Sequence, residues 1–317
     1  METLPLFEEP SDFDRAGLRD KLAALAAEDV WIGTSSWKYP GWIGQVYTRS
    51  RYSQRGRFSE KRFEAECLRE YAGTFPIVCG DFSFYQFPSE AFWQRLFGTA
   101  PAPLKFAFKV PEEITVKIFR MHPRYGPRAG EKNPSFLNAV LLQNVFLDLL
   151  EPYRDRIAVL IFEFGSFSGE SYGSATEFAA QLDPFLAVLP DRYRYAVEIR
   201  NQEFLTREYF QCLARHGIAH VFNAWTRMPE LDEQMCLPEA FTADFTVARA
   251  LLRRTRPYAD AVEKFTPYQE IRDPNPAARE ALKNLIQRAR DRHEPSYIFV
   301  NNRLEGNAPL TIQAVVD

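Results

Sequence analysis

Residues 30–42 read VWIGTSSWKYPGW, an apolar run that breaks into small residues, aromatics and a Pro-Gly pair. The apolar part is short enough for a buried strand, and the glycines, serines and proline after it are typical of a loop. We therefore predict a first core strand that delivers polar groups and two tryptophans to the loop at its end.

Further apolar runs follow along the chain and alternate with stretches of helical periodicity. About eight such runs, separated by helices, are the pattern of a parallel α/β barrel. We predict a (β/α)8 TIM-type barrel in one domain over residues 29–317, preceded by an N-terminal tail and leading helix over residues 1–28. A doubly wound sheet is the alternative. The predicted strands start at residue 30 and continue over 76–85, 104–110, 157–165, 194–200, 220–225, 245–252 and 296–302.

Some segments are less regular than the barrel pattern. Residues 245–252 fit a strand or a helix, so we expect an irregularity at the seventh strand. The connection over 111–135 is long, and loops of this length are usually functional or disordered. The phenylalanines at 82 and 84 are expected to alternate as strand residues do.

Composition narrows the class of protein. The formal net charge of -3 argues against a generally basic surface that coats nucleic acid. The four cysteines are widely spaced, and residues 1–14 lack the pattern of a secretory signal, which favours a reduced cytoplasmic protein. No apolar run approaches the roughly 18 residues of a membrane span. We expect a soluble cytoplasmic protein that does not enter the membrane, with an oligomeric state that stays open.

Polar residues occur at the ends of the predicted strands, where the functional groups of parallel barrels lie. Because side chains alternate along a strand, residues two apart share a face and can point together into one mouth. This reasoning nominates Ser35, Trp37, Asp81, Tyr85, Lys109, Glu163, Glu198, Arg200, Asn223, Arg249, Asn301 and Asn302.

Our first hypothesis for this mouth is an enzyme that acts on a small anionic ligand, phosphorylated or carboxylated. Cations at positions 109, 200 and 249 would bind the anion. Glu198 and Glu163 would transfer protons, with Lys109 and Asp81 as further catalytic candidates. The other eight residues would bind substrate. Hydrolysis and proton abstraction both remain open, as does a purely structural network of paired charges.

The second hypothesis is a nucleic-acid-binding protein. Basic residues gather in the segments 49–62 and 117–132, and Trp37, Trp42 and Tyr125 could stack on bases. For the segment 49–62, a solvated loop is the favoured interpretation.

The sequence gives little sign of metal or cofactor chemistry. The four histidines are scattered, which makes a histidine-rich metal centre improbable, and no glycine-rich dinucleotide or phosphate-loop motif is present. We predict no cofactor and no metal. Cys79 shares the inward face with Asp81, and we interpret it as a core cysteine.

Five segments, taken in order, resemble the domain-of-unknown-function 72 family, the YecE-like proteins. These segments are IGTSSWKYPGW, GDFSFYQFP, FAFKVPEEIT, YAVEIRNQEF and YIFVNNRLEGNAP, and they span residues 31 to about 310. The resemblance implies a TIM-type barrel but no assigned reaction. The chain departs from the family pattern at Cys79, Asp81 and Glu163, and the pattern of the family's seventh strand is retained only at Arg249.

Overall fold

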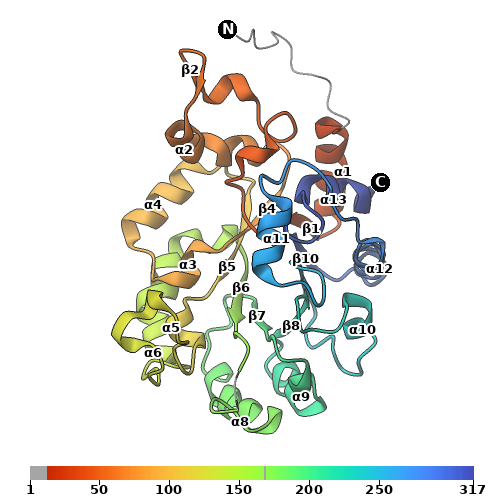
Figure 1. Cartoon of the computed structure of the whole chain (residues 1–317). Helices are drawn as coiled ribbons and strands as arrows, with labels where there is room; N and C mark the ends of the chain where they lie inside the picture. Colours follow the sequence, from red (N-terminus) through yellow and green to blue (C-terminus); the bar gives the residue numbers. More distant parts are fainter. Residues whose placement is uncertain (1–12, 168) are drawn as a thin grey trace.

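A computed structural model describes residues 13–167 and 169–317 of the chain. Within these residues eight parallel strands close into a barrel in the order β1-β10-β9-β8-β7-β6-β5-β4 (Figure 1). The predicted barrel is therefore confirmed, and the doubly wound sheet is wrong. The strands are β1 Val30–Thr34, β4 Ile77–Gly80, β5 Lys105–Lys109, β6 Ile157–Glu163, β7 Tyr195–Glu198, β8 Ala219–Ala224, β9 Thr246–Ala250 and β10 Ser296–Val300.

Helices surround the barrel, and several begin where a polar side chain accepts a hydrogen bond from the first turn, as at Ser89 and Thr206. Helix α9 ends before Gly217, whose φ of +61° is typical of a glycine that closes a helix. The helices are α1 Arg15–Ala27, α2 Glu60–Tyr71, α3 Phe82–Tyr85, α4 Glu90–Thr99, α5 Glu112–Thr115, α6 Ala139–Leu142, α7 Asp148–Leu150, α8 Ala175–Leu186, α9 Arg207–Arg215, α10 Leu231–Met235, α11 Tyr258–Phe265, α12 Pro276–Arg292 and α13 Ala308–Val316.

The leading helix is present as α1, which packs against β1 and α13. Residues 1–12 of the predicted N-terminal tail lie outside the described residues.

Strand alternation divides the apolar side chains between two cores. Tyr195, Val197 and Ile199 belong to the outer core between barrel and helices, whereas Ala196 belongs to the core inside the barrel. Small and β-branched residues dominate the inside, where little room is available. The same parity directs the polar residues at the strand ends toward the barrel axis.

The seventh strand is regular, contrary to expectation. Strand β9 pairs with β10 over five positions and with β8 over four. Its alanines, Ala248 and Ala250, face the outer core, and pairing on both edges decides the structure and not helix propensity. A register shift lies instead between Phe106 and Ala107, where β5 pairs with β6.

The second strand is shorter than predicted. Strand β4 ends at Gly80, and residues 82–85 form the helical turn α3, so Phe82 and Phe84 do not alternate as strand residues. Gly80 permits this turn, because a Cβ there would lie 2.7 Å from the Phe82 ring. Ser83 fixes the turn by donating a hydrogen bond to the carbonyl oxygen of Lys109 at 2.7 Å.

The two long basic segments are structured. Residues 111–135 contain α5, the 3-10 segment Pro123–Arg128 and a bridge between Ile118 and Lys132. Asn133 donates side-chain hydrogen bonds to the carbonyls of Glu113 and Val116, both at 2.7 Å. Residues 49–62 contain the 3-10 segment Arg49–Tyr52 and a hairpin of β2 Ser53–Gln54 and β3 Arg57–Phe58, with the arginines exposed as expected. The remaining short helical segments are Pro40–Trp42, Gln143–Leu147, Glu151–Arg156 and Gln202–Phe204.

The seam between β1 and β4 is narrow and depends on Gly33. These strands pair at only two positions, Gly33 with Ile77 and Thr34 with Val78. The Tyr71 hydroxyl bridges them, accepting from the Thr34 amide at 3.1 Å and donating to the Ile77 carbonyl at 2.9 Å. A Cβ on Gly33 would lie 1.9 Å from that same carbonyl oxygen.

We therefore expect Gly33→Ala to lower the free energy of unfolding by about 2 kcal/mol or more, because backbone must move to admit one methyl group. Urea unfolding measures the change. Gly98→Ala in α4 is the matched control: a Cβ there meets nothing within 4 Å, so stability should stay equal or rise by about 0.5–1 kcal/mol. Equal urea midpoints for Gly33→Ala and wild type would contradict the close approach.

Candidate active site at the mouth of the barrel

Six charged side chains meet at the carboxyl ends of the strands. They come from the ends of β5, β6 and β7, from β9 and from the residues just after β4 and β7. The barrel topology brings these ends together although the residues are far apart in sequence. The six are Asp81, Lys109, Glu163, Glu198, Arg200 and Arg249, and below we call them the charged layer.

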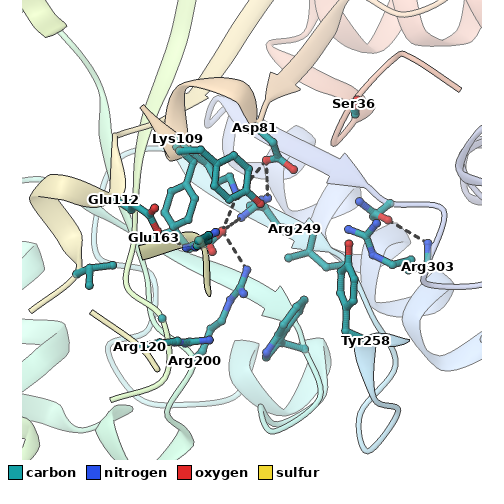
Figure 2. A pocket seen from close by; sticks show the side chains of 18 of the residues that line it. Ser36, Asp81, Lys109, Glu112, Arg120, Glu163, Arg200, Arg249, Tyr258 and Arg303 are labelled. Atoms are coloured by element: carbon teal, nitrogen blue, oxygen red, sulfur yellow. Dashed lines mark hydrogen bonds and ion pairs between the residues drawn. The ribbon is translucent and has the colours of Figure 1, made fainter. Parts of the chain in front are cut away.

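One oxygen of Glu163 is the centre of the charged layer. Glu163 Oε2 lies 2.8 Å from Arg249 Nη1, 2.9 Å from Arg200 Nη2 and 3.1 Å from Lys109 Nζ. Figure 2 shows these cations pointing toward Glu163. Three cations thus share a single oxygen of the buried Glu163 carboxylate.

The other two carboxylates balance the remaining charge. Glu198 pairs with Arg249 and lies 3.2 Å from Arg200, and Asp81 lies 3.1 Å from Lys109 and 3.5 Å from Arg249. Three cations therefore face three carboxylates. This balance is needed because an unpaired charge in the barrel interior would be costly.

The ionised forms of Glu163 and Lys109 are favoured by their neighbours. Burial alone would raise the pKa of Glu163, but the charges of Arg200, Lys109 and Arg249 outweigh it and hold that pKa far below its usual range. Burial would lower the pKa of Lys109, yet Asp81 and Glu163 outweigh it and raise that pKa. Glu163 is consequently a carboxylate at neutral pH and has no proton to donate.

A cavity of about 650 Å³ lies over the charged layer. Its walls carry six cationic and three carboxylate side chains together with several aromatic rings. The charged lining residues are Lys109, Arg120, Arg124, Arg200, Arg249, Arg303, Asp81, Glu112 and Glu163, and the aromatic ones are Tyr39, Phe84, Tyr85, Tyr125, Trp225 and Tyr258. The cavity therefore has an excess of positive charge, which favours an anion.

Two of its arginines lack a carboxylate partner within residues 13–167 and 169–317. Arg120 makes no ion pair there, and its guanidinium lies against Gly165, where a Cβ would come within 2.5 Å of Nη2. Arg303 packs on the Tyr258 ring at 4.6 Å, and its buried Nε has no hydrogen-bond partner in this part of the chain. Figure 2 shows both guanidinium groups at the cavity.

Seven of the twelve residues predicted from the sequence line this cavity, and they are Asp81, Tyr85, Lys109, Glu163, Arg200, Arg249 and Asn301. Tyr85 reaches it by a route that differs from the prediction. It belongs to α3 and not to a strand, and it is 59% exposed at the rim. The expected strand-face position of Tyr85 is therefore wrong.

The other five lie away from the cavity. Glu198 is fully buried below it, and Ser35 is buried beside β10, where its amide donates to the Val300 carbonyl at 3.0 Å. Asn223 donates to the Ile199 carbonyl at 2.9 Å, and Asn302 Oδ1 accepts from the Trp42 indole at 3.1 Å. Trp37 lines a neighbouring cavity. The two asparagine amides therefore hold backbone and core in place.

Several lining residues were not among the twelve predicted for the mouth, although Arg120, Arg124 and Tyr125 lie in the segment 117–132 of the nucleic-acid hypothesis. Glu112, Arg120, Arg124 and Tyr125 come from the segment 111–135, whose fold could not be read from periodicity. Glu112 accepts a hydrogen bond from the Tyr125 hydroxyl at 2.9 Å and also pairs with Arg124. Burial raises the pKa of Glu112, although Tyr125 and Arg124 partly oppose this. The available signal was its position three residues after Lys109, at the end of a strand.

The basic segments 49–62 and 117–132 are partly neutralised by neighbouring acids. Arg62 pairs with Glu66 at 3.2 Å, and Arg128 pairs with Glu113 at 2.9 Å. Arg51 lies 3.7 Å from Glu70. Nucleic-acid binding by these segments stays a prediction, and these ion pairs give it no added support.

Cys79 and His220 are core residues. Burial raises the pKa of the Cys79 thiol to about 12, and burial lowers the pKa of His220 to about 3.

In the part of the chain that the structure describes, no three His, Cys, Asp or Glu side chains are grouped to hold a metal ion. No helix in that part is long and apolar enough to cross a membrane. The fold and the site together define a parallel α/β barrel with a charged cavity at its mouth.

The chain belongs to the family described as "Protein of unknown function DUF72", whose model matches residues 31–317. A DUF72 family protein from Thermotoga maritima MSB8 is similar, with 21% identity, a TM-score of 0.59, and coverage of 89% of this chain and 96% of that chain. One from Enterococcus faecalis V583 has 14% identity, a TM-score of 0.56, and coverage of 90% and 95%. The comparison with curated proteins finds no match. At these identities the likeness concerns the fold.

The central place of Glu163 leads to a prediction on stability and pH. Glu163→Gln should lower the free energy of unfolding at pH 7 by about 3–5 kcal/mol, because three buried cations lose their shared charge. Since the pKa of Glu163 is lowered on folding, its stabilisation is complete above the ordinary value of 4.5 and is lost as the pH falls below it. The gap between wild type and variant should therefore shrink below pH 4.5.

Urea unfolding at pH 7 and at steps down to pH 3 measures this gap. Glu66→Gln is the matched control, because Glu66 is half exposed in its pair with Arg62 and the change should stay within about 0.5 kcal/mol. A Glu163→Gln gap that is small, or that stays constant with pH, would refute the central role of the carboxylate.

Proposed function

We propose that the protein is an enzyme that acts on a small molecule with a phosphate or carboxylate group, using acid/base chemistry at the barrel mouth. The observation that carries this proposal is the cationic excess of the cavity over a charged layer that is already balanced. Arg120 and Arg303 face the cavity and have no carboxylate partner among the described residues. An anionic ligand supplies that missing partner.

Two of the cavity arginines, Arg200 and Arg303, pack on aromatic rings before a ligand arrives. Arg200 lies 3.8 Å from the centroid of the Trp225 ring while one of its nitrogens contacts Glu163. Arg303 packs on the ring of Tyr258 without a carboxylate contact among the described residues. Little side-chain freedom remains to be lost on binding, and planar guanidinium groups suit the paired oxygens of phosphate and carboxylate.

Proton transfer fits Asp81 best among the carboxylates. Its side chain is 34% exposed, it lines the cavity, and it contacts Lys109 at 3.1 Å. Glu112 is a second candidate, because its raised pKa brings it closer to the range in which a carboxyl group can donate a proton. The contacts of Glu163 and Glu198 favour a supporting role, in which they orient the cations. This chemistry suits a hydrolase, a lyase or an isomerase.

Inorganic phosphate is the simplest probe of anion binding. We expect calorimetric titration to show binding to wild type, and Arg120→Gln and Arg303→Gln each to weaken it about tenfold or more, since each removes a charge-assisted contact. Arg207→Gln is the control, because Arg207 is 74% exposed in α9 and does not line the cavity. Absence of binding by both phosphate and succinate to wild type would overturn the anion site.

Proton transfer can be tested on a panel of sugar phosphates and hydroxy acids followed by proton NMR in D2O. Deuterium incorporation would report proton abstraction from carbon, and phosphate release would report hydrolysis. We expect Asp81→Asn to slow any turnover found by about 10²–10⁴-fold, with phosphate affinity changed by much less. Asp20→Asn, at an exposed position of α1, should leave turnover unchanged. Equal turnover by Asp81→Asn and wild type would exclude Asp81 from the chemistry.

A further inference from the structure

A second cavity of about 400 Å³ lies beside the first. The two share the lining residues Ser36 and Asp81, so they meet at the end of β4. Figure 2 shows Ser36 and Asp81 on one side of the first cavity. The second cavity extends outward from them, between the loop after β1 and the helices α2 and α4.

The chemistry of the second cavity differs from that of the first. Its walls are mainly aromatic and aliphatic, with Trp37, Phe82, Phe92, Leu68 and Leu96. Phe82 lies 4.8 Å from Phe92 and 6.1 Å from Trp37 between ring centroids, the latter edge to face. These rings present faces and edges that match another aromatic ring.

Two cations border this aromatic wall. Arg95 lies 5.7 Å from the Phe92 ring centroid, and Lys38 lies 6.0 Å from that of Trp37. Both side chains are exposed, whereas Trp37 is buried. A ligand group in the cavity would thus be apolar where it meets the rings and open to water at one edge.

We propose that the substrate carries an aromatic ring that occupies this second cavity while its anionic group lies among the arginines of the first. The inference rests on the proposed function, because it assigns the apolar part of the same ligand. Asp81 borders both cavities, so the bonds that join the ring to the anionic group pass beside the most accessible carboxylate of the charged layer. This gives Trp37, in the loop after β1, a role in ligand selection.

Two phosphate esters of equal charge test the proposal. Calorimetric titration compares 1-naphthyl phosphate with methyl phosphate on wild type, Trp37→Ala and Phe92→Ala. We expect the naphthyl ester to bind wild type at least about tenfold more tightly, from apolar burial and ring contacts. In both variants this ratio should fall toward one, while the affinity for methyl phosphate stays unchanged and shows that the fold is intact. Phe241→Ala, at a partly buried ring outside both cavities, should keep the ratio.

The outcomes separate this inference from the proposed function. If methyl phosphate binds wild type and the naphthyl ester binds no better, the second cavity takes no aromatic ring and the anion site stands. A high ratio that survives in Phe92→Ala also overturns the inference, even if Trp37→Ala fails to fold. If neither ester binds, the proposed function fails. Uncharged 1-naphthol then tests the second cavity alone. Binding of 1-naphthol that is lost in Phe92→Ala supports an aromatic-ring site in this cavity, and absence of binding to wild type overturns that site.

Discussion

The contact of one Glu163 oxygen with three cations is the interaction on which the mouth of the barrel depends. Arg249, Arg200 and Lys109 all lie within 3.1 Å of Glu163 Oε2. In a buried place, each cation would be too costly to keep charged without a partner, and the single carboxylate serves all three. The remaining carboxylates complete the balance, so the floor of the cavity is close to neutral although it consists almost wholly of ionised groups.

Because the floor is close to neutral, the loops above it determine the net charge of the cavity. The outer arginines come from segments that follow the strands, and Arg120 and Arg303 are not committed to any carboxylate of the described chain. The barrel thus supplies a rigid, charge-balanced base, and the loops supply cations free to meet a ligand. This division explains how a network that looks purely structural, with its charges paired, can still lie under a ligand site.

The sequence predicts the charged layer better than the walls around it. Side-chain alternation and the common end of parallel strands are enough to bring Lys109, Glu163 and Arg249 together, because both are fixed by backbone geometry. Residues 111–135 have no periodicity, and their positions follow from internal hydrogen bonds such as those of Asn133. Glu112 was therefore missed, and Arg120 was assigned to a basic nucleic-acid-binding segment and not to the mouth. Side-chain alternation also does not show which amides are hydrogen-bonded to the backbone, as Asn223 is.

The end of β4 shows how one local feature separates structural from accessible charge. Continued alternation from Cys79 would direct residue 81 into the buried layer, as it directs Glu198 on β7. Instead Gly80 leaves space for the Phe82 ring, and the chain turns into α3 directly after Asp81. Asp81 therefore keeps its contact with Lys109 but remains one-third exposed, at the border of the first and second cavities. The same turn carries Phe82 into the wall of the second cavity. Gly80 thus determines both the exposure of the Asp81 carboxylate and the apolar surface beside it.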